Sequence, residues 1–353
     1  MNVRCQDVRL SGYTTLRLGG PARTFVEVTT EDELIEAVRT ADHDGEPVLL
    51  LGGGSNLVVS DAGFPGTVVR IGTRGVTVNG GTVTAQAGED WDGFVARAVA
   101  EGLSGVECLS GIPGRVGATP VQNVGAYGQD VSQTITEVRV WDRAAETVRV
   151  FSAEECGFAY RHSAFKGSDR HVVLSVTFQL AETGESDLIV FEELAKRLGT
   201  PVGATASLAD VRATVLDLRR GKGMVLDPAD PDTRSAGSFF TNPILTPEEL
   251  AHLSARATGF PAFREPDGRT KTSAAWLIEK AGFRKGHARG PVRLSGKHTL
   301  ALTNPGPDGT TADLLALARE IRDGVRESFG VTLVNEPTFV GVTLDEDTTA
   351  PAR

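Results

Sequence analysis

Hydrophobic positions recur at helical spacing in several parts of the chain. In residues 88–103, Trp91, Phe94, Val95, Ala98 and Val99 fall at i, i+3, i+4, i+7 and i+8. This spacing places all five on one face of a helix, which we expect to end at Gly102. Similar stripes predict helices over 31–45, from Ser207 to Leu218, over 273–282 and over 311–330. The helix at Ser207 also begins with a cap-like pair, Ser207 and Asp210.

Runs of β-branched and aromatic residues, bounded by turn formers, predict strands between these helices. They lie at 48–52, 67–71, 82–88, 136–142, 146–152, 171–180, 298–304, 331–334 and 338–344. The mixture indicates an α+β protein, and no period of about 20 to 50 residues suggests a solenoid. We place domain boundaries near residues 71 and 222. The final strands are too short to form a sheet alone, so we expect residues 331–353 to return to the domain spanning 72–222.

Length and composition fit this picture. The 353 residues exceed the roughly 250 to 300 that one hydrophobic core supports, which agrees with two or three domains. With 40% hydrophobic and 23% charged residues, the chain should fold throughout. A formal net charge of −10 argues against a nucleic-acid-binding protein, which needs a basic face. Any anionic ligand must therefore meet locally placed arginines and lysines.

Cysteine usage and the N-terminal segment indicate where such a chain works. Cys5, Cys108 and Cys156 are an odd number without a CxxC pair, so neither a disulfide framework nor a metal site is indicated. The first fifteen residues lack the apolar core of a signal peptide, and no apolar run approaches the ~20 residues that span a bilayer. We expect a cytoplasmic protein with no membrane contact. Nothing in the pattern indicates an interface, so we also expect a monomer.

Two glycine clusters, at 51–61 and 110–130, are the most unusual local feature. The chain has 41 glycines, yet it has no GxxxxGK[ST] motif, and GGGSNLVV does not continue as GxGxxG into a helix. A P-loop and a Rossmann domain are therefore both disfavoured. Consecutive glycines after a buried strand let backbone N–H groups converge on a phosphate. Tight turns are the alternative, and composition alone favours them.

Eight motifs occur in a fixed order over nearly the whole chain. They are TTLRLGGPA at 14–22, LGGGSNLVVSD at 51–61, SGIPGRVGATPVQNVGAYGQD at 110–130, AYRHSAFK at 159–166, AGSFFTNP at 236–243, AAWLIEKAGFRKG at 274–286, KHTLALTN at 297–304 and LVNEPTFVG at 333–341. Together they resemble the UDP-N-acetylenolpyruvoylglucosamine reductase (MurB) family, within the flavoprotein superfamily related to vanillyl-alcohol oxidase. One motif alone is weak evidence, whereas eight in order are highly specific.

The resemblance implies a three-domain fold and a reaction. Domains 1–71 and 72–222, the latter with return strands 331–353, would hold FAD, and domain 223–330 would cover the substrate. NADPH would reduce FAD, NADP would leave, and hydride would pass to the enolpyruvyl double bond to give UDP-N-acetylmuramate for peptidoglycan. The stretch 185–204 resembles the extra substrate loop of the longer, type I subtype. Phe191 occupies the position of that loop's usual tyrosine.

The resemblance also assigns catalytic residues. Arg161 and Glu336 would lie at the substrate carboxylate, and Ser238 would donate a proton to substrate carbon. A guanidinium offers fixed, permanently charged donors to a carboxylate. A glutamic acid facing another carboxylate should be held protonated, which lets it donate a hydrogen bond. From its residue type alone, a serine before Phe-Phe is more often a turn or cap residue.

Further residues are assigned to the cofactor and to the UDP-sugar. FAD would contact Gly52, Gly53, Gly54, Ser55, Asn56, Gly111, Ile112, Gly114, Gly117, Ala118, Gln122, Asn123, Gly125, Ala126 and Gly128. Substrate contacts would come from Tyr160, Phe191, Lys222, Asn242 and either Lys297 or His298. Tyr127 and Lys222 have plainer readings, as a packed aromatic and an exposed helix-end lysine. No His or Cys stands in 51–61, so FAD should be bound non-covalently.

Two other functions compete with this reductase. A related flavin oxidase, which returns electrons to oxygen, would lack the serine of GSFF and the glutamate of NEP. A non-catalytic nucleotide-sugar or flavin-binding protein should have lost one catalytic position. Arg161, Ser238 and Glu336 are all present, which favours the reductase over both alternatives.

Overall fold

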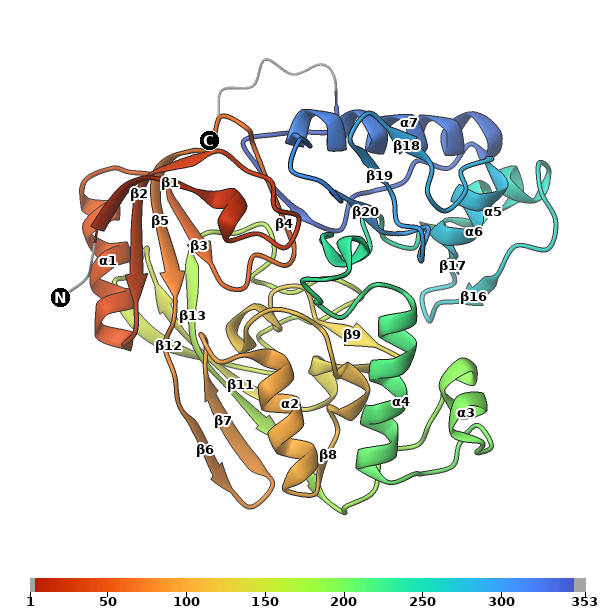
Figure 1. Cartoon of the computed structure of the whole chain (residues 1–353). Helices are drawn as coiled ribbons and strands as arrows, with labels where there is room; N and C mark the ends of the chain where they lie inside the picture. The colour runs from red at the N-terminus through yellow and green to blue at the C-terminus, as the bar shows by residue number, and fades with distance from the viewer. Residues whose placement is uncertain (1–3, 346–353) are drawn as a thin grey trace. The chain divides into compact units, whose positions relative to one another are not determined.

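The computed structural model describes residues 4–345, which form two compact units (Figure 1). Unit 1 consists of residues 4–8, 22–53 and 65–225. Unit 2 consists of residues 9–21, 54–64 and 226–345. Both helices and strands occur in each unit, as expected for an α+β protein. Within the described residues, no helix combines the length and apolar character needed to cross a membrane.

The first sheet of unit 1 contains four strands in the order β1-β2-β5-β3. Their bounds are Arg4–Arg9 for β1, Pro21–Val28 for β2, Phe64–Ile71 for β5 and Val48–Leu51 for β3, which runs parallel to β5. Helix α1, Glu31–His43, begins at Thr30, whose hydroxyl accepts the Glu33 N–H at 3.2 Å. Its buried face, including Leu34 and Val38, packs with strand residues such as Val69. The helix therefore covers one face of this sheet.

The second sheet of unit 1 is antiparallel, in the order β12-β11-β13-β7-β6. These strands are β12 Thr147–Ser152, β11 Ile135–Asp142, β13 His171–Gln179, β7 Thr82–Gln86 and β6 Val76–Asn79. Helix α2, Trp91–Ala100, packs on it through Phe94, whose ring centroid lies 4.9 Å from that of Phe178. Aromatic packing thus fixes the start of α2.

The rest of unit 1 is built around helix α4, Leu208–Gly221. Its predicted stripe is buried and packs with Leu194 of helix α3, Glu192–Leu198. Figure 1 shows α3 and α4 as neighbours. Short strand pairs complete the unit, namely β8 Leu103–Ser104 with β14 Ala181–Glu182, and β9 Gly125–Ala126 with β10 Gln129–Asp130.

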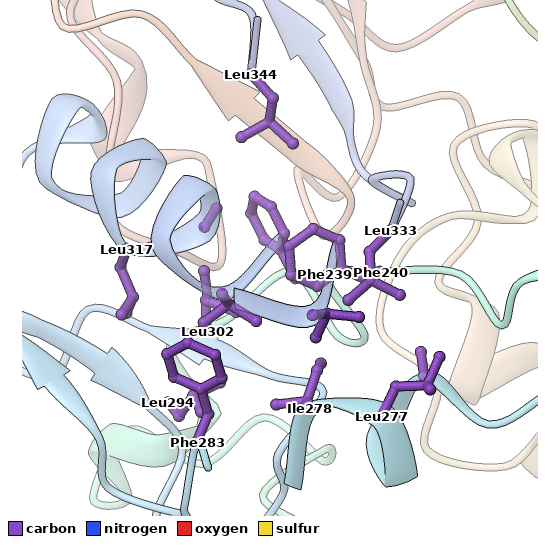
Figure 2. Packing of buried hydrophobic residues seen from close by; sticks show 14 of the residues in the cluster. Phe239, Phe240, Leu277, Ile278, Phe283, Leu294, Leu302, Leu317, Leu333 and Leu344 are labelled. Atoms are coloured by element: carbon purple, nitrogen blue, oxygen red, sulfur yellow. The ribbon is translucent and has the colours of Figure 1, made fainter. Parts of the chain in front are cut away.

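Unit 2 has helix α7, Thr311–Phe329, as its longest element. The other helices are α5 Pro247–Ser254 and α6 Ala274–Lys280, and the strands are β15 Ile244–Leu245, β16 Ala262–Arg264, β17 Thr270–Thr272, β18 Ala288–Arg289, β19 Val292–Leu294 and β20 Leu302–Thr303. Strand β21, Thr338–Val340, pairs in parallel with β4, Leu57–Val59. Figure 2 shows the core, in which Phe239, Phe240, Ile278 and Leu317 come from distant parts of the chain.

Within the described residues, the five predicted helices are present, α3 and α5 form where no helix is predicted, and three expectations about strands are wrong. Only Leu302–Thr303 is extended within 298–304, because the Ala301 N–H bonds to the His298 carbonyl and closes a turn. Residues 331–334 form no strand. The last strand pairs with β4 rather than with the 72–222 segment. Residues 346–353 of the expected return lie outside the described residues, and the three-domain division remains a proposal.

Candidate active site

Within unit 1, the two glycine clusters approach each other through their backbones. A Cβ on Gly53 would lie 2.8 Å from the Gly114 Cα, so a side chain at Gly53 would collide with the main chain. The stretch from Gly114 to Gly117 runs beside 87–91, because the Val116 N–H bonds to the Glu89 carbonyl and the Gly117 N–H to the Ala87 carbonyl. These residues come from both segments predicted to hold FAD, so the fold does bring the segments together.

Gly54 has a steric requirement of its own in unit 2. Its φ is +61°, and a Cβ there would lie 1.9 Å from the Tyr13 carbonyl oxygen. The Thr15 N–H bonds to the Gly54 carbonyl at 3.1 Å, and the Thr338 N–H bonds to the Asn56 carbonyl at 2.9 Å. The positive φ and the close Tyr13 carbonyl thus require glycine at position 54, whether or not a ligand binds there. The contact of 52–56 with a phosphate stays a prediction.

A bidentate ion pair fixes the start of the second cluster. Asp92, in the first turn of α2, accepts both Nη atoms of Arg212 on α4, at 2.7 and 2.9 Å, and the Gly111 N–H at 2.6 Å. Burial raises the pKa of Asp92, but the hydrogen bonds from Arg212 and Gly111 outweigh it, so the pKa is lowered. Sequence reasoning missed this pair, since nothing in the local pattern relates residues 120 positions apart.

Arg161 lies in a tight turn beside the second cluster. Ala159 and His162 exchange backbone hydrogen bonds, and Arg161 takes a φ of +51°. Such a conformation costs a non-glycine residue about 1 kcal/mol or more, so its surroundings must hold it there. The Arg161 Nη2 donates to the Gly125 carbonyl at 3.0 Å, and the Asn123 side chain donates to the Ala159 carbonyl at 3.3 Å. A predicted catalytic residue is thereby fixed to the predicted FAD segment.

An aromatic and charged cluster joins two more predicted residues of unit 1, Phe191 and Lys222, to Tyr127. The Phe191 ring meets the Tyr127 ring edge-on, with centroids 5.3 Å apart. The Lys222 Nζ lies 5.7 Å from the Tyr127 centroid and 2.7 Å from Oε2 of Glu193. Burial raises the pKa of Tyr127, which agrees with its plainer reading as a packed aromatic. Lys222 is also the C-cap residue of α4, which agrees with its plainer reading as a helix-end lysine.

In unit 2, backbone pairing brings the segments of Ser238 and Glu336 together. The Glu336 N–H donates to the Phe239 carbonyl at 2.9 Å, and the Thr241 N–H donates to the Val334 carbonyl at 3.0 Å. Phe239 and Phe240 are each 1% exposed, and Figure 2 shows their rings in the core with Leu333. Ser238 and Glu336 themselves are half-buried. The core therefore fixes the backbone on which both side chains are carried.

The predicted substrate contacts in unit 2 already have intramolecular partners. Asn242 Oδ1 accepts the Ala274 N–H at 3.0 Å, at the start of α6. The Lys297 Nζ lies 2.5 Å from Asp230 Oδ2, and this hydrogen bond raises the pKa of Lys297. The His298 N–H lies 3.3 Å from the Ser295 hydroxyl oxygen. In unit 1, Tyr160 is exposed, with the Arg161 guanidinium 5.5 Å from its ring. None of these contacts tests substrate binding.

The cysteines behave as expected. Cys5 is exposed, Cys108 and Cys156 are buried, and all three are free thiols. Burial raises the pKa of Cys156 to about 12 and raises the pKa of Cys108 further. The two buried thiols are therefore protonated at neutral pH, which makes them poor nucleophiles.

Comparison with known proteins gives the same result along the whole chain. The description "FAD binding domain" matches residues 22–151, and "UDP-N-acetylenolpyruvoylglucosamine reductase, C-terminal domain" matches residues 228–340. The UDP-N-acetylenolpyruvoylglucosamine reductase of Thermobifida fusca is 60% identical, over 96% of this chain and 98% of that protein. The Streptomyces coelicolor protein of the same name is 57% identical, over 96% of this chain and 90% of that protein.

A solved structure supports the relationship in three dimensions. The crystal structure of UDP-N-acetylenolpyruvylglucosamine reductase (MurB) from Thermus caldophilus has a TM-score of 0.67 and 28% identity. The match covers 96% of this chain and 99% of that one. The identities of 60% and 57% with the Thermobifida and Streptomyces proteins extend over nearly complete chains. Together with the ordered motifs and their placement in the fold, they show that the chain belongs to the UDP-N-acetylenolpyruvoylglucosamine reductase (MurB) family.

Proposed function

We propose that the chain is an FAD-dependent UDP-N-acetylmuramate dehydrogenase of peptidoglycan precursor synthesis. It uses NADPH to reduce UDP-N-acetylglucosamine enolpyruvate to UDP-N-acetylmuramate. Family membership supports the reaction. The single structural observation that carries the proposal is the hydrogen bond between the Glu336 N–H and the Phe239 carbonyl, because it pairs the backbones that bear the proposed acid, Ser238, and the proposed carboxylate partner.

The residues present fit a bound FAD. Gly53 meets the Gly114 backbone so closely that a Cβ would collide with it, and Gly117 meets Ala87 in the same way, so both predicted FAD segments require glycine at these positions. Backbone N–H groups of 52–56 would hold the diphosphate, and residues of 111–128 would hold the ribityl chain and the ring system. When bound, FAD supplies the acceptor for hydride from NADPH and the donor of hydride to substrate. No His or Cys lies in 51–61, so we propose non-covalent binding.

The chemistry left to the protein is charge stabilisation and proton delivery. Hydride addition at the terminal carbon of the enolpyruvyl group moves negative charge into its carboxylate. In this proposal the Arg161 guanidinium and the Glu336 side chain stabilise that charge. The Ser238 hydroxyl then donates a proton to the adjacent carbon. A free hydroxyl is too weak an acid for this step, so it depends on the basicity of the developing carbanion.

Substrate recognition is proposed to use aromatic and polar side chains. Lys222 and Phe191 would meet the UDP portion, together with Tyr160. Asn242 and either Lys297 or His298 would contribute further polar contacts. The partners are thus two small molecules, the UDP-sugar and NADPH. We place the reaction in the cytoplasm and propose a monomeric enzyme that binds no nucleic acid.

An anaerobic pair of half-reactions tests the function. Purified protein loaded with FAD should be yellow, and NADPH should bleach it under nitrogen. Adding the enolpyruvyl UDP-sugar should then restore the colour and yield UDP-N-acetylmuramate. An oxidase would instead recover its colour only with oxygen. A binding protein would not be reduced by NADPH at a catalytic rate, and either of these results contradicts the proposal.

A further inference from the structure

Arg115 lies between the two glycine clusters but has no assigned role. It follows Gly114, and its side chain passes over the first glycine of the other cluster. A Cβ built on Gly52 would lie 3.4 Å from the Arg115 Cγ and 3.5 Å from its Cβ. Both residues belong to unit 1, and the Arg115 side chain is 19% exposed. A largely covered guanidinium is thus carried at the start of the predicted phosphate-binding backbone.

The backbone of Arg115 is rigidly placed. The Trp91 N–H donates to the Gly114 carbonyl at 3.2 Å, and the Val116 N–H donates to the Glu89 carbonyl at 3.0 Å. These bonds flank Arg115 on both sides and connect it to the start of α2. The side chain therefore begins from a fixed point, and only side-chain freedom remains to be lost when its guanidinium binds an anion.

The guanidinium itself has only a loose partner. Its Nη1 lies 3.6 Å from Asp90 Oδ2, which is beyond hydrogen-bond distance. Asp90 uses its other oxygen to cap α2, accepting the Gly93 N–H at 2.9 Å. Within residues 4–345 the Arg115 guanidinium makes no hydrogen bond. By contrast, the Arg212 guanidinium donates two hydrogen bonds to the Asp92 carboxylate, at 2.7 and 2.9 Å.

Neighbouring positive charges also surround the Arg115 guanidinium, which lacks a hydrogen-bonded carboxylate among the described residues. Burial lowers the pKa of the Arg115 guanidinium, the positive charges of Arg74 and Arg70 lower it further, and the carboxylates of Asp90 and Glu89 only partly oppose this shift. Each of those two arginines has its own carboxylate, Arg74 with Glu89 at 3.3 Å and Arg70 with Glu27 at 3.2 Å. An incoming anion would therefore find in Arg115 a charged group whose donors are not already taken.

We propose that Arg115 is a further FAD-binding residue, whose guanidinium donates to the diphosphate held by the backbone of 52–56. This inference rests on the proposed function, since it requires FAD in that site. The backbone N–H groups fix the position of the diphosphate, and Arg115 supplies the full positive charge that they lack. The cofactor's negative charge is thereby balanced in a protein whose net charge is −10.

The test is equilibrium binding of FAD to cofactor-free protein, followed by flavin fluorescence at low and high salt. Arg115→Gln should weaken FAD binding roughly 10- to 100-fold, the range expected for a charge-assisted hydrogen bond. Its affinity should also depend less on salt than that of the wild type. Arg115→Lys, which keeps the charge but not the planar fork, should recover part of the affinity. At saturating FAD, the visible spectrum should be unchanged, because the ring contacts remain.

Arg97→Gln is the matched control, because Arg97 lies on α2 and, among residues 4–345, pairs with the surface carboxylate of Glu101 and with the Val76 carbonyl. It should bind FAD as the wild type does. If Arg115→Gln binds within twofold of the wild type with the same salt dependence, the inference is wrong while the proposed function stands. If Arg115→Gln fails to fold, the FAD affinity of Arg115→Lys tests the inference instead. An affinity of Arg115→Lys equal to that of the wild type at both salt concentrations overturns the inference. If wild-type protein takes up no FAD, the proposed function fails first and the inference with it.

Discussion

Ser238 is positioned by its neighbours in the chain rather than by bonds of its own. Gly237 before it has a φ of +73°, and Phe239 and Phe240 after it anchor in the unit 2 core. Within the described part of the chain, the Ser238 hydroxyl makes no hydrogen bond. A hydroxyl held by packing and left without a competing acceptor can be directed entirely at substrate. In the proposed role, this positioning would act together with the basicity of the developing carbanion to offset the weakness of the hydroxyl as an acid.

Ser238→Ala should separate the two half-reactions. Flavin reduction by NADPH needs no proton delivered to substrate carbon, so it should proceed near the native rate. Reoxidation by the enolpyruvyl UDP-sugar should slow by about 10²- to 10⁴-fold, the usual contribution of a positioned general acid. Stopped-flow absorbance of the flavin measures both rates. Native reoxidation, or an equal loss in both half-reactions, would remove Ser238 from the role of proton donor.

Glu336→Gln should affect turnover more than substrate affinity. In the proposed role, its hydrogen bond would strengthen as charge reaches the substrate carboxylate, so removing the acid should slow turnover by about 10²-fold or more. The dissociation constant of the UDP-sugar should change only a few-fold. Steady-state kinetics with a separate binding titration provide the two numbers. Equal losses in both would make Glu336 a binding residue instead.

The sequence could identify these side chains only through their motifs. Ser238 and Glu336 stand in short, ordered patterns, so the resemblance located them. Asp92, Arg212 and Arg115 stand in no pattern that indicates a partner, because their contacts join residues far apart in the chain. Their geometry depends on how α2 and α4 pack, and hydrophobic spacing does not specify that packing.

At the scale of elements, one buried carboxylate organises the end of β11. Asp142 accepts two hydrogen bonds from Arg170, at 2.8 and 2.7 Å, and the N–H groups of Ala144 and Ala145 at 3.1 and 3.2 Å. Arg149 and His171 face the same carboxylate, at 3.6 and 3.7 Å. The bonds from Arg170, which outweigh burial, hold the pKa of Asp142 far below its ordinary value. This group thus joins β11, β12 and the start of β13.

Stability should therefore fall in acid, in a way that depends on Asp142. Its pKa is lower in the folded chain, so the unfolded chain takes up a proton first as the pH falls below about 5. The stabilisation is complete above the unfolded pKa, about 3.9, and is lost as the pH drops towards the folded pKa. Urea unfolding at pH 7, 5 and 3.5 measures the effect. Asp142→Asn should be less stable at pH 7 and should lose less on acidification.

Arg170→Gln provides the reciprocal test, because it leaves the carboxylate but removes its two strongest hydrogen bonds. It should also reduce the loss of stability between pH 5 and pH 3.5. An acid dependence identical in all three proteins would show that other carboxylates govern unfolding.

Helices could be predicted from the sequence where the helical spacing of hydrophobic residues continued for several turns. The helices α1, α2, α4 and α7 each bury the stripe that their spacing predicts. The segments 298–304 and 331–334 have strand-like composition but little extended structure, because their backbone groups bond to turns and to neighbouring loops. A short apolar run does not show which backbone it will pair with.

At the scale of the whole molecule, the proposed cofactor contacts come from two glycine clusters, at 51–61 and 110–130, that lie far apart in the sequence. No histidine or cysteine, the residues that attach flavin covalently, stands in residues 51–61. FAD should accordingly be held by the folded chain and by no covalent bond.

Denaturing the yellow protein with acid or heat should release all of its flavin. The supernatant after precipitation should contain intact FAD, identified by chromatography, and the pellet should be colourless. Flavin that stays with the washed, denatured pellet would contradict non-covalent binding. Free FAD added to native protein should also raise its melting temperature, because a ligand that binds only the folded state stabilises it by mass action.

The core of unit 2 is assembled from separate lengths of chain. Leu16, Leu18 and Val58 lie in it beside residues from Ala236 to Leu344, and β21 has β4 as its pairing partner. A fragment beginning at residue 226 would lack all of these N-terminal contributions. It would expose an apolar surface where they belong, and so would be prone to aggregate. During synthesis, residues 9–21 and 54–64 leave the ribosome long before residues 226–345, with which they form unit 2. Unit 2 therefore reaches its native state only after translation is nearly complete.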